Sequence, residues 1–380
     1  MFEPSEEQIA LMAAAREAAT AILGGTLKAD DEAELFRKDY IRALGEVGLT
    51  GIPTPDAYGG LGLGYLDYSL VLEEVSAVSA SYGVSLAVTG LPQVILAAMG
   101  TDAQKERWLP GLAAGEMLGA FCLSEPGSGS DAASLKATAT LDGDEYVLRG
   151  TKFWITHGSY ADVYVVMART GGPGARGISA FLVPDGLPGL SFGKKEEKMG
   201  LRASPTVEVV LDGVRVPSSA RIGAEGDGFR VALSALDSGR ITIGAISVGL
   251  ARAALAVATD YAAQRVQFGK PIIDFQGVGF MLADMATSIE QARLLVHKAA
   301  WLRDNGRPYA HIAAMAKCAA TDCAMAVTTD AVQVLGGYGY TREYPVERYM
   351  RDAKVMQIVE GTNQVQRLVI SRHLRQQVTR

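Results

Sequence analysis

The stretch FRVALSALDSGRITIGAISVGLARAALAVATDYAAQ, from Phe229 to Gln264, decides the fold. Its apolar residues keep a helical pattern for about 36 residues, or roughly 54 Å at 1.5 Å per residue. A helix of this length needs partners to cover its apolar surface. Helical patterns over 276–305, 311–335 and 363–376 supply them. The sequence therefore predicts a long antiparallel four-helix bundle.

The chain before this bundle has two different patterns. From Gly119 to about Val216, short alternating or β-branched runs are separated by Gly, Pro and Asp, which indicates a β barrel or sandwich. The first part is helical, and Ser5 with Gln8 forms a capping box for a helix that reaches about Leu23. We predict an α+β fold whose N-terminal helical, middle β and C-terminal bundle domains lie at 1–118, 119–225 and 226–380.

Two glycine-rich segments do not predict a nucleotide-binding loop. Residues 53–64 follow no strand, and we assign them to a surface loop. Gly172, Gly174 and Gly177 satisfy GxGxxG, but they join two strands and open no helix. We assign them to a hairpin loop.

The composition excludes several classes of protein. The 380 residues are 48% hydrophobic and 21% charged, as expected for a globular chain of two or three domains. A net charge of −6 argues against a nucleic-acid or anionic-membrane partner. Three cysteines and four histidines lack metal-binding spacing, so we expect no metal site and a reducing cytoplasm. We also expect no membrane span, because charge or Gly interrupts the apolar runs.

One carboxylate is a candidate base. Glu360 lies within RDAKVMQIVEGTNQVQ, after an apolar pair and before Gly361, which predicts a bend beside apolar surface. Desolvation there would raise the carboxyl pKa toward that of a useful base. The alternative is a Glu near a helix start, with Thr362 or Asn363 as the cap.

This stretch resembles the carboxy-terminal signature of the acyl-CoA dehydrogenases. The resemblance rests on Glu-Gly-Thr after the apolar pair, and on Gln364 with the run QRLVISRHL that follows. It implies that Glu360 is the catalytic base and that Thr362 and Gln364 contact FAD. It also places Val359 and Gly361 beside the substrate.

Two segments of the middle region resemble the flavin-binding motifs of this family. They are FCLSEPGSGSD, at 121–131, and KFWITHG, at 152–158. In the first, the resemblance implies that Ser130 also helps to hold the thioester ligand. For Trp154 in the second, the alternative is a buried core indole. The FAD contacts implied by the two motifs are Phe121, Leu123, Ser124, Gly129, Ser130, Trp154 and Thr156.

The carboxy-terminal region carries the rest of the family pattern. Asp237 and Arg240 lie three residues apart on one helix face, and the resemblance makes them substrate-side residues; the alternative is a solvated salt bridge. The motifs QRVQFGKPIIDFQ and QVLGGYG resemble FAD contacts, the first reaching the cofactor of a neighbouring subunit. The contacts implied by these two motifs are Arg265, Phe268, Gln276, Gln333, Gly336 and Gly337.

The resemblance covers nearly the whole chain and implies a function. It implies FAD-dependent dehydrogenation of an acyl-CoA thioester to the trans-2-enoyl-CoA, with electrons passed to electron-transferring flavoprotein. Such an enzyme would serve fatty acid or branched-chain amino acid catabolism, as a dimer or a homotetramer formed by two dimers. The alternatives are an acyl-CoA oxidase of the same fold that uses oxygen, and a non-catalytic helical assembly protein.

The acyl group is predicted to be uncharged. Family members that accept dicarboxylic chains place a cation at the closed end of the pocket, but the equivalent stretch here, residues 79–94, has none. The resemblance is closest to short-chain and methyl-branched members. Val359 stands where several relatives carry Tyr and leaves room for a branch, whereas Ser124 in place of Thr is a minor departure.

Overall fold

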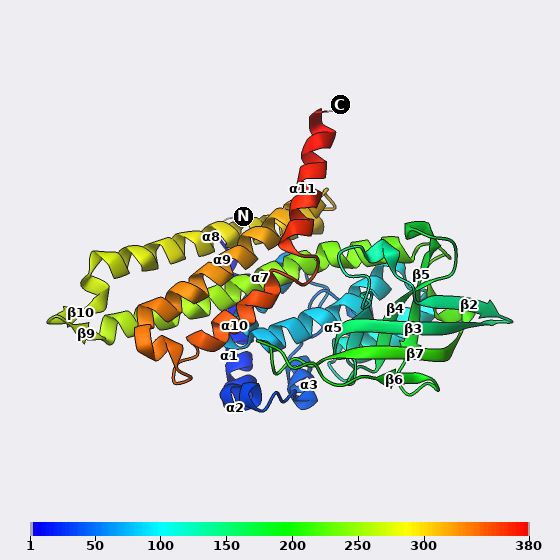
Figure 1. The fold of residues 1–380 in the computed structure, drawn as a ribbon, viewed down its shortest axis with the longest axis horizontal. Coiled ribbons are helices and arrows are strands. Elements are labelled where there is room, and N and C mark those ends of the chain that lie inside the picture. The colour runs from blue at the N-terminus through cyan, green and yellow to red at the C-terminus, as the bar shows by residue number, and fades with distance from the viewer. Residues whose placement is uncertain (1–2, 379–380) are drawn as a thin grey trace.

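The computed structural model describes residues 3–378 and consists of helices, a sheet and further helices in chain order (Figure 1). The molecule is elongated. The sheet lies at one end, and the short hairpin of β9 (Val266–Gln267) and β10 (Lys270–Pro271) lies at the other. The α+β fold predicted from the sequence is confirmed.

The N-terminal part is helical. The Gln8 N–H donates to the Ser5 hydroxyl at 3.2 Å, and the Gln8 side chain accepts from the Ser5 N–H at 3.0 Å, so the predicted capping box is confirmed. A short second helix was not predicted. The helices are α1 (Glu6–Leu23), α2 (Leu27–Glu32), α3 (Lys38–Glu46), α4 (Tyr65–Val78), α5 (Ala80–Met99) and α6 (Asp102–Ala113).

The middle region forms an eight-stranded sheet in the order β6-β7-β3-β2-β4-β5-β8, with β1 paired in parallel to β4. The glycines of the GxGxxG match lie in the hairpin between β4 and β5, as predicted. The strands are β1 (Gly119–Cys122), β2 (Thr138–Asp142), β3 (Glu145–Thr156), β4 (Val163–Arg169), β5 (Ile178–Pro184), β6 (Leu190–Phe192), β7 (Thr206–Pro217) and β8 (Arg221–Ile222).

The C-terminal part is built on three long helices that pack on one another, α7, α8 and α9. The predicted long helix is confirmed, because α7 has 37 residues. The helix α10 was not predicted, and α11 projects from the body after its first contacts with α9 (Figure 1). The bounds are α7 (Gly228–Gln264), α8 (Gln276–Asp304), α9 (Ala310–Leu335), α10 (Val346–Met356) and α11 (Asn363–Val378).

Buried charge joins the N-terminal helices to this bundle. Glu73 on α4 is fully buried and accepts hydrogen bonds from Arg293 at 2.8 Å and from His297 at 2.7 Å, both on α8. Arg252 on α7 approaches the same carboxylate at 3.3 Å. A buried carboxylate needs such partners, so this cluster fixes how α4, α7 and α8 pack.

Two helices, α5 and α7, are long and apolar enough to cross a membrane by length and composition. In both, 72% of the apolar window is buried inside the protein. Their apolar character therefore matches their place in the core, where α5 and α7 also contact each other.

Candidate active site

Glu360 lies in the tight turn between α10 and α11, where the sequence predicted a bend. Glu360 and Gly361 both have left-handed backbone conformations, with φ of 54° and 86°. The Thr362 hydroxyl accepts a hydrogen bond from the Val365 N–H at 3.3 Å and caps α11. A left-handed conformation is unfavourable for a residue with a Cβ, so other contacts must hold Glu360 in this turn.

The Glu360 carboxylate lies against α7. Burial raises its pKa from 4.5 to about 7, and the nearby Arg240 and Lys317 cations oppose this rise. Its Oε2 atom is buried and has no hydrogen-bond partner among the described residues. The α7 backbone at Gly239 is so near that a Cβ there would clash with the carboxylate. The absence of a side chain at Gly239 thus leaves the space that Glu360 occupies.

Arg240 and Asp237 form an ion pair on α7. Arg240 is only 5% exposed, so the pair is not the solvated salt bridge that the sequence left open. Burial raises the pKa of Asp237, and the Arg240 cation opposes that rise. The Arg240 Nε–H group is buried and unpartnered within residues 3–378. The pair brings a buried cation and an unused donor to the surroundings of Glu360.

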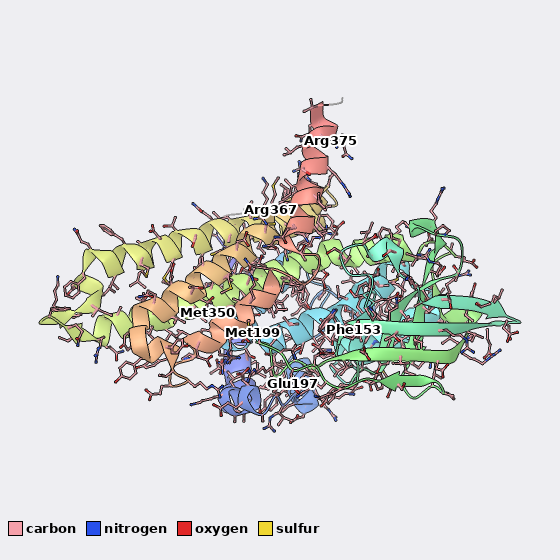
Figure 2. The ribbon with its side chains drawn as sticks, in the orientation of Figure 1. Phe153, Glu197, Met199, Met350, Arg367 and Arg375 are labelled. Carbon is pink, nitrogen blue, oxygen red and sulfur yellow. The ribbon has the colours of Figure 1, made fainter. Side chains whose placement is uncertain are left out.

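The two candidate flavin motifs of the middle region lie side by side. The Phe153 N–H donates to the Ser124 carbonyl at 2.8 Å, which joins the loop after β1 to β3. Phe153 is labelled in Figure 2. The buried Lys152 ammonium donates to the Leu123 carbonyl at 3.1 Å. Trp154 is 60% exposed, so it is not a core indole. The other candidate residues on these two segments are Phe121, Gly129, Ser130 and Thr156.

The remaining candidate flavin residues divide between two places. Phe268, in the turn of the β9–β10 hairpin, is 95% exposed, and the Arg265 guanidinium lies 5.8 Å from the centre of the Tyr338 ring. This hairpin lies at the end of the molecule opposite the sheet (Figure 1), so one chain does not bring the two sets together. The residues gathered at the hairpin end are Arg265, Phe268, Gln276, Gln333, Gly336 and Gly337. Those at the start of α11 are Thr362 and Gln364.

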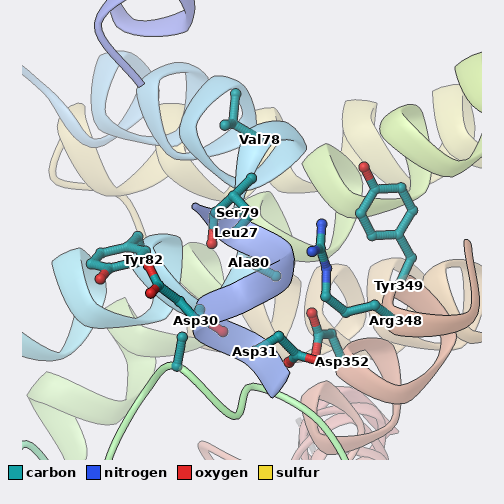
Figure 3. A pocket seen from close by; sticks show the side chains of 12 residues that line it. Leu27, Asp30, Asp31, Val78, Ser79, Ala80, Tyr82, Arg348, Tyr349 and Asp352 are labelled. Atoms are coloured by element: carbon teal, nitrogen blue, oxygen red, sulfur yellow. The ribbon is translucent and has the colours of Figure 1, made fainter. Parts of the chain in front are cut away.

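The helix α10, which leads into the Glu360 turn, is anchored by a loop of the middle region. The Asp352 carboxylate accepts from the Leu201 N–H at 2.6 Å, and Arg351 donates to the Met199 carbonyl at 3.0 Å. Asp352 borders a cavity of ≈ 10 Å³ beside α2 (Figure 3), and burial raises its pKa to about 7. These contacts fix the segment from which the turn emerges.

Two further side chains hold the turn, and the sequence did not identify them as site residues. Lys317 on α9 donates to the Gly361 carbonyl at 3.0 Å and to the Asn363 side-chain oxygen at 2.9 Å. Gln366 donates to the carbonyls of Glu360 and Gly361, at 3.0 and 2.8 Å. The sequence signal for Lys317 was its place in an otherwise uncharged run of mainly small residues.

Family models match almost the whole chain. The acyl-CoA dehydrogenase N-terminal domain matches residues 5–116, the middle domain matches 120–214, and the C-terminal domain matches 226–375. The chain therefore belongs to the acyl-CoA dehydrogenase family and is an oxidoreductase. The resemblance seen in the sequence is confirmed.

Individual relatives agree with this assignment. The short-chain-specific acyl-CoA dehydrogenase of Clostridium acetobutylicum is 47% identical over 90% of both chains. The butyryl-CoA dehydrogenase structure from Megasphaera elsdenii is 44% identical, with a TM-score of 0.96 over 98% of this chain and 99% of that one. A chain solved in work on the electron transferring flavoprotein of Acidaminococcus fermentans is 47% identical, with the same TM-score and coverage.

The raised pKa of Glu360 predicts how its burial affects stability. The folded protein disfavours the charged carboxylate, so the contribution of Glu360 is fully present below pH 4.5 and is lost as pH rises through about 7. Glu360→Gln should therefore gain stability relative to the unchanged protein between these pH values, by roughly 1.4 kcal/mol per unit of pKa shift. Urea unfolding of both proteins at pH 4.5, 6 and 8 measures this difference. A difference independent of pH would contradict the burial of a titrating Glu360.

Proposed function

We propose that this protein is an FAD-dependent dehydrogenase of short or methyl-branched acyl-CoA thioesters, with Glu360 as the base that removes the α proton. The supporting observation is the Glu360 turn itself. It presents a buried carboxylate with a pKa of about 7 and an Oε2 atom that has no partner among the described residues. A general base works best when its pKa lies near the working pH.

The same turn offers a donor for the thioester oxygen. The Glu360 backbone N–H makes no hydrogen bond to another described residue. Loss of an α proton places negative charge on the thioester oxygen, and a fixed donor stabilises that charge as it develops. The Glu360 N–H would serve as this donor, with Ser130, Val359 and Gly361 beside the substrate and with the Asp237–Arg240 pair orienting the base.

The exposed groups of the middle region suit a flavin. Trp154 presents an indole at a left-handed bend (φ 62°), next to the loop of Leu123 and Ser124. In that loop the N–H groups of Gly129 and Ser130 have no partner within the described chain. FAD bound here would supply the acceptor for the β hydride. The residues proposed to hold it on this side are Phe121, Leu123, Ser124, Gly129, Ser130, Trp154, Thr156, Thr362 and Gln364.

The hairpin-end residues would complete the cofactor site of a second copy. Phe268 is 95% exposed and Tyr340 is 88% exposed, which is unusual for aromatic side chains without a partner. We assign Arg265, Phe268 and Gln276, with the Gln333 to Gly337 turn, to the FAD of a neighbouring subunit. The protein would then be a dimer or a dimer of dimers.

The relatives and the sequence support a proposed electron acceptor and a proposed acyl group. The 47% identical chain from work on electron transferring flavoprotein supports that flavoprotein as the partner. The short-chain and butyryl-CoA relatives support a small acyl group. Residues 79–94, which comprise Ser79 between α4 and α5 and most of α5, carry no cation that could pair with a carboxylate on the acyl chain.

The role of the base is tested by Glu360→Gln. FAD should stay bound to this variant, but butyryl-CoA should reduce the flavin more slowly by a factor of roughly a thousand or more. The proton acceptor is lost while the shape of the side chain is retained. Anaerobic stopped-flow bleaching of the flavin measures the rate, and Glu343→Gln, on an exposed loop, is the matched control. Retention of more than a tenth of the original rate would remove Glu360 from this role.

The acyl preference is tested by the same bleaching across a panel of thioesters. Butyryl-, isobutyryl- or 2-methylbutyryl-CoA should reduce the flavin fastest, whereas glutaryl-CoA should reduce it slowly because its carboxylate would be buried without a cation. Slow reoxidation of the reduced protein in air is expected of a dehydrogenase, and rapid reoxidation would indicate an oxidase. Palmitoyl- or glutaryl-CoA as the best substrate would contradict the proposed acyl group.

The shared cofactor site is tested by Arg265→Ala. If Arg265 serves the neighbouring subunit, this variant should lose FAD on dilution and regain it as protein concentration rises. Absorbance of bound flavin, measured together with light scattering across a dilution series, reports both quantities. A monomer that retains FAD tightly would exclude the shared site.

A further inference from the structure

Lys317 is a buried cation in the middle of α9. It is 0% exposed, and it forms no ion pair with any described carboxylate. Burial lowers its pKa to about 8. An ammonium group held inside a protein without a paired carboxylate is costly, so its hydrogen bonds must compensate.

Both acceptors of Lys317 belong to the Glu360 turn. Nζ donates to the Gly361 carbonyl at 3.0 Å and to the Asn363 side-chain oxygen at 2.9 Å. Asn363 is itself held, because its amide donates to Thr321 at 2.9 Å and to Asp322 at 2.7 Å. The lysine thus connects α9 to Gly361 and Asn363, which follow Glu360 by one and three positions.

The conformation of the turn explains why it needs such an anchor. Glu360 has φ of 54°, and this left-handed conformation costs of order 1–3 kcal/mol for a residue other than glycine. Gln366 holds the Glu360 and Gly361 carbonyls from within α11. Lys317 holds the same turn from a different helix, so together with the bonds of Asn363 to Thr321 and Asp322 it fixes the turn relative to the bundle.

We propose that Lys317 is a positioning residue for the base: its ammonium group, through its hydrogen bonds to Gly361 and Asn363, fixes the Glu360 carboxylate and backbone N–H relative to α7. It acts through Gly361 and Asn363 and through its charge, without touching substrate. Lys317 positions the Glu360 turn whatever reaction the protein catalyses. The effect of this positioning on acyl-CoA dehydrogenation rests on the proposed function.

The charge of Lys317 is one of two that act on the Glu360 carboxylate, and the other is that of Arg240 on α7. Asp237 pairs with Arg240, Cys318 and Asp322 lie near Lys317 on α9, and Arg367 of α11 pairs with Asp322. Lys317 and Arg240 both lower the pKa of Glu360 against the effect of burial. Removing the lysine charge should therefore move deprotonation of Glu360 to higher pH.

The test compares three substitutions of Lys317 in the FAD-loaded protein. Lys317→Met removes the charge and both hydrogen bonds, Lys317→Gln removes the charge but keeps a donor, and Lys317→Arg keeps the charge. Thr328→Val is the matched control, because Thr328 is a buried α9 residue that bonds only its own helix at Ala324 and Met325. Flavin reduction by butyryl-CoA is followed from pH 5.5 to 9.

Lys317→Met should lower the limiting rate by about tenfold to a hundredfold, the size expected when a reacting group is misplaced by about 1 Å. The pH at which the rate of flavin reduction reaches half of its limiting value should rise in this variant. Lys317→Gln should show the raised midpoint with a smaller loss of rate, and Lys317→Arg should keep the original midpoint. Thr328→Val should change neither quantity, although it can lower the unfolding temperature.

A second readout does not depend on catalysis. The infrared carboxyl band of Glu360, identified by its loss in Glu360→Gln, should titrate at higher pH in Lys317→Met, and the amides of residues 360–363 should exchange hydrogen faster. These two results would support the positioning role even if no acyl-CoA reduces the flavin, which would count against the proposed function alone. An unchanged midpoint and unchanged amide exchange in Lys317→Met, or in Lys317→Gln if the Met variant does not fold, would overturn the inference.

Discussion

The packing of α7 is the constraint on which the rest of the structure depends. This helix of 37 residues contacts α4, α5, α8, α9 and β5 of the sheet. Burial of apolar surface stabilises it by roughly 25 cal/mol per Å². Because Gly239 and Arg240 lie on the buried stretch of α7, the packing that forms the core also sets one wall of the Glu360 site.

The sequence predicted the elements that have a strong local signal. The long α7 and the capped α1 follow from helical periodicity and from Ser5 with Gln8, and the bend at Glu360 follows from its place before Gly361. The six-residue α2 is too short for helical periodicity to reveal it. The helix α10 buries an apolar stripe of Val346, Tyr349, Ala353 and Met356, which we did not recognise in the sequence among its charged residues. The hydrogen bond from Arg351 to Asp31 joins these two helices, and local sequence does not encode it.

In the candidate site, too, the sequence predicted residues that lie in short motifs but not residues whose contacts are distant in the chain. Family motifs located Glu360 and the exposed Trp154, because each lies in a distinctive short segment. Lys317 lies more than 40 residues from the turn that it holds, as its contacts with Gly361 and Asn363 span 44 and 46 positions. A lysine among small residues signals a buried partner, but only the three-dimensional packing identifies that partner.

The base proposed at Glu360 must satisfy two opposing requirements, and the geometry of the turn fits both. Basicity requires that its oxygen keep its lone pairs free, since each hydrogen bond to the charged form would lower the pKa. Ionisation inside a protein requires nearby positive charge, since burial alone disfavours the carboxylate. Arg240 is engaged by Asp237, and Lys317 is engaged by Gly361 and Asn363. Both cations therefore act on Glu360 through space, while its Oε2 atom is left free of described partners and able to accept a proton.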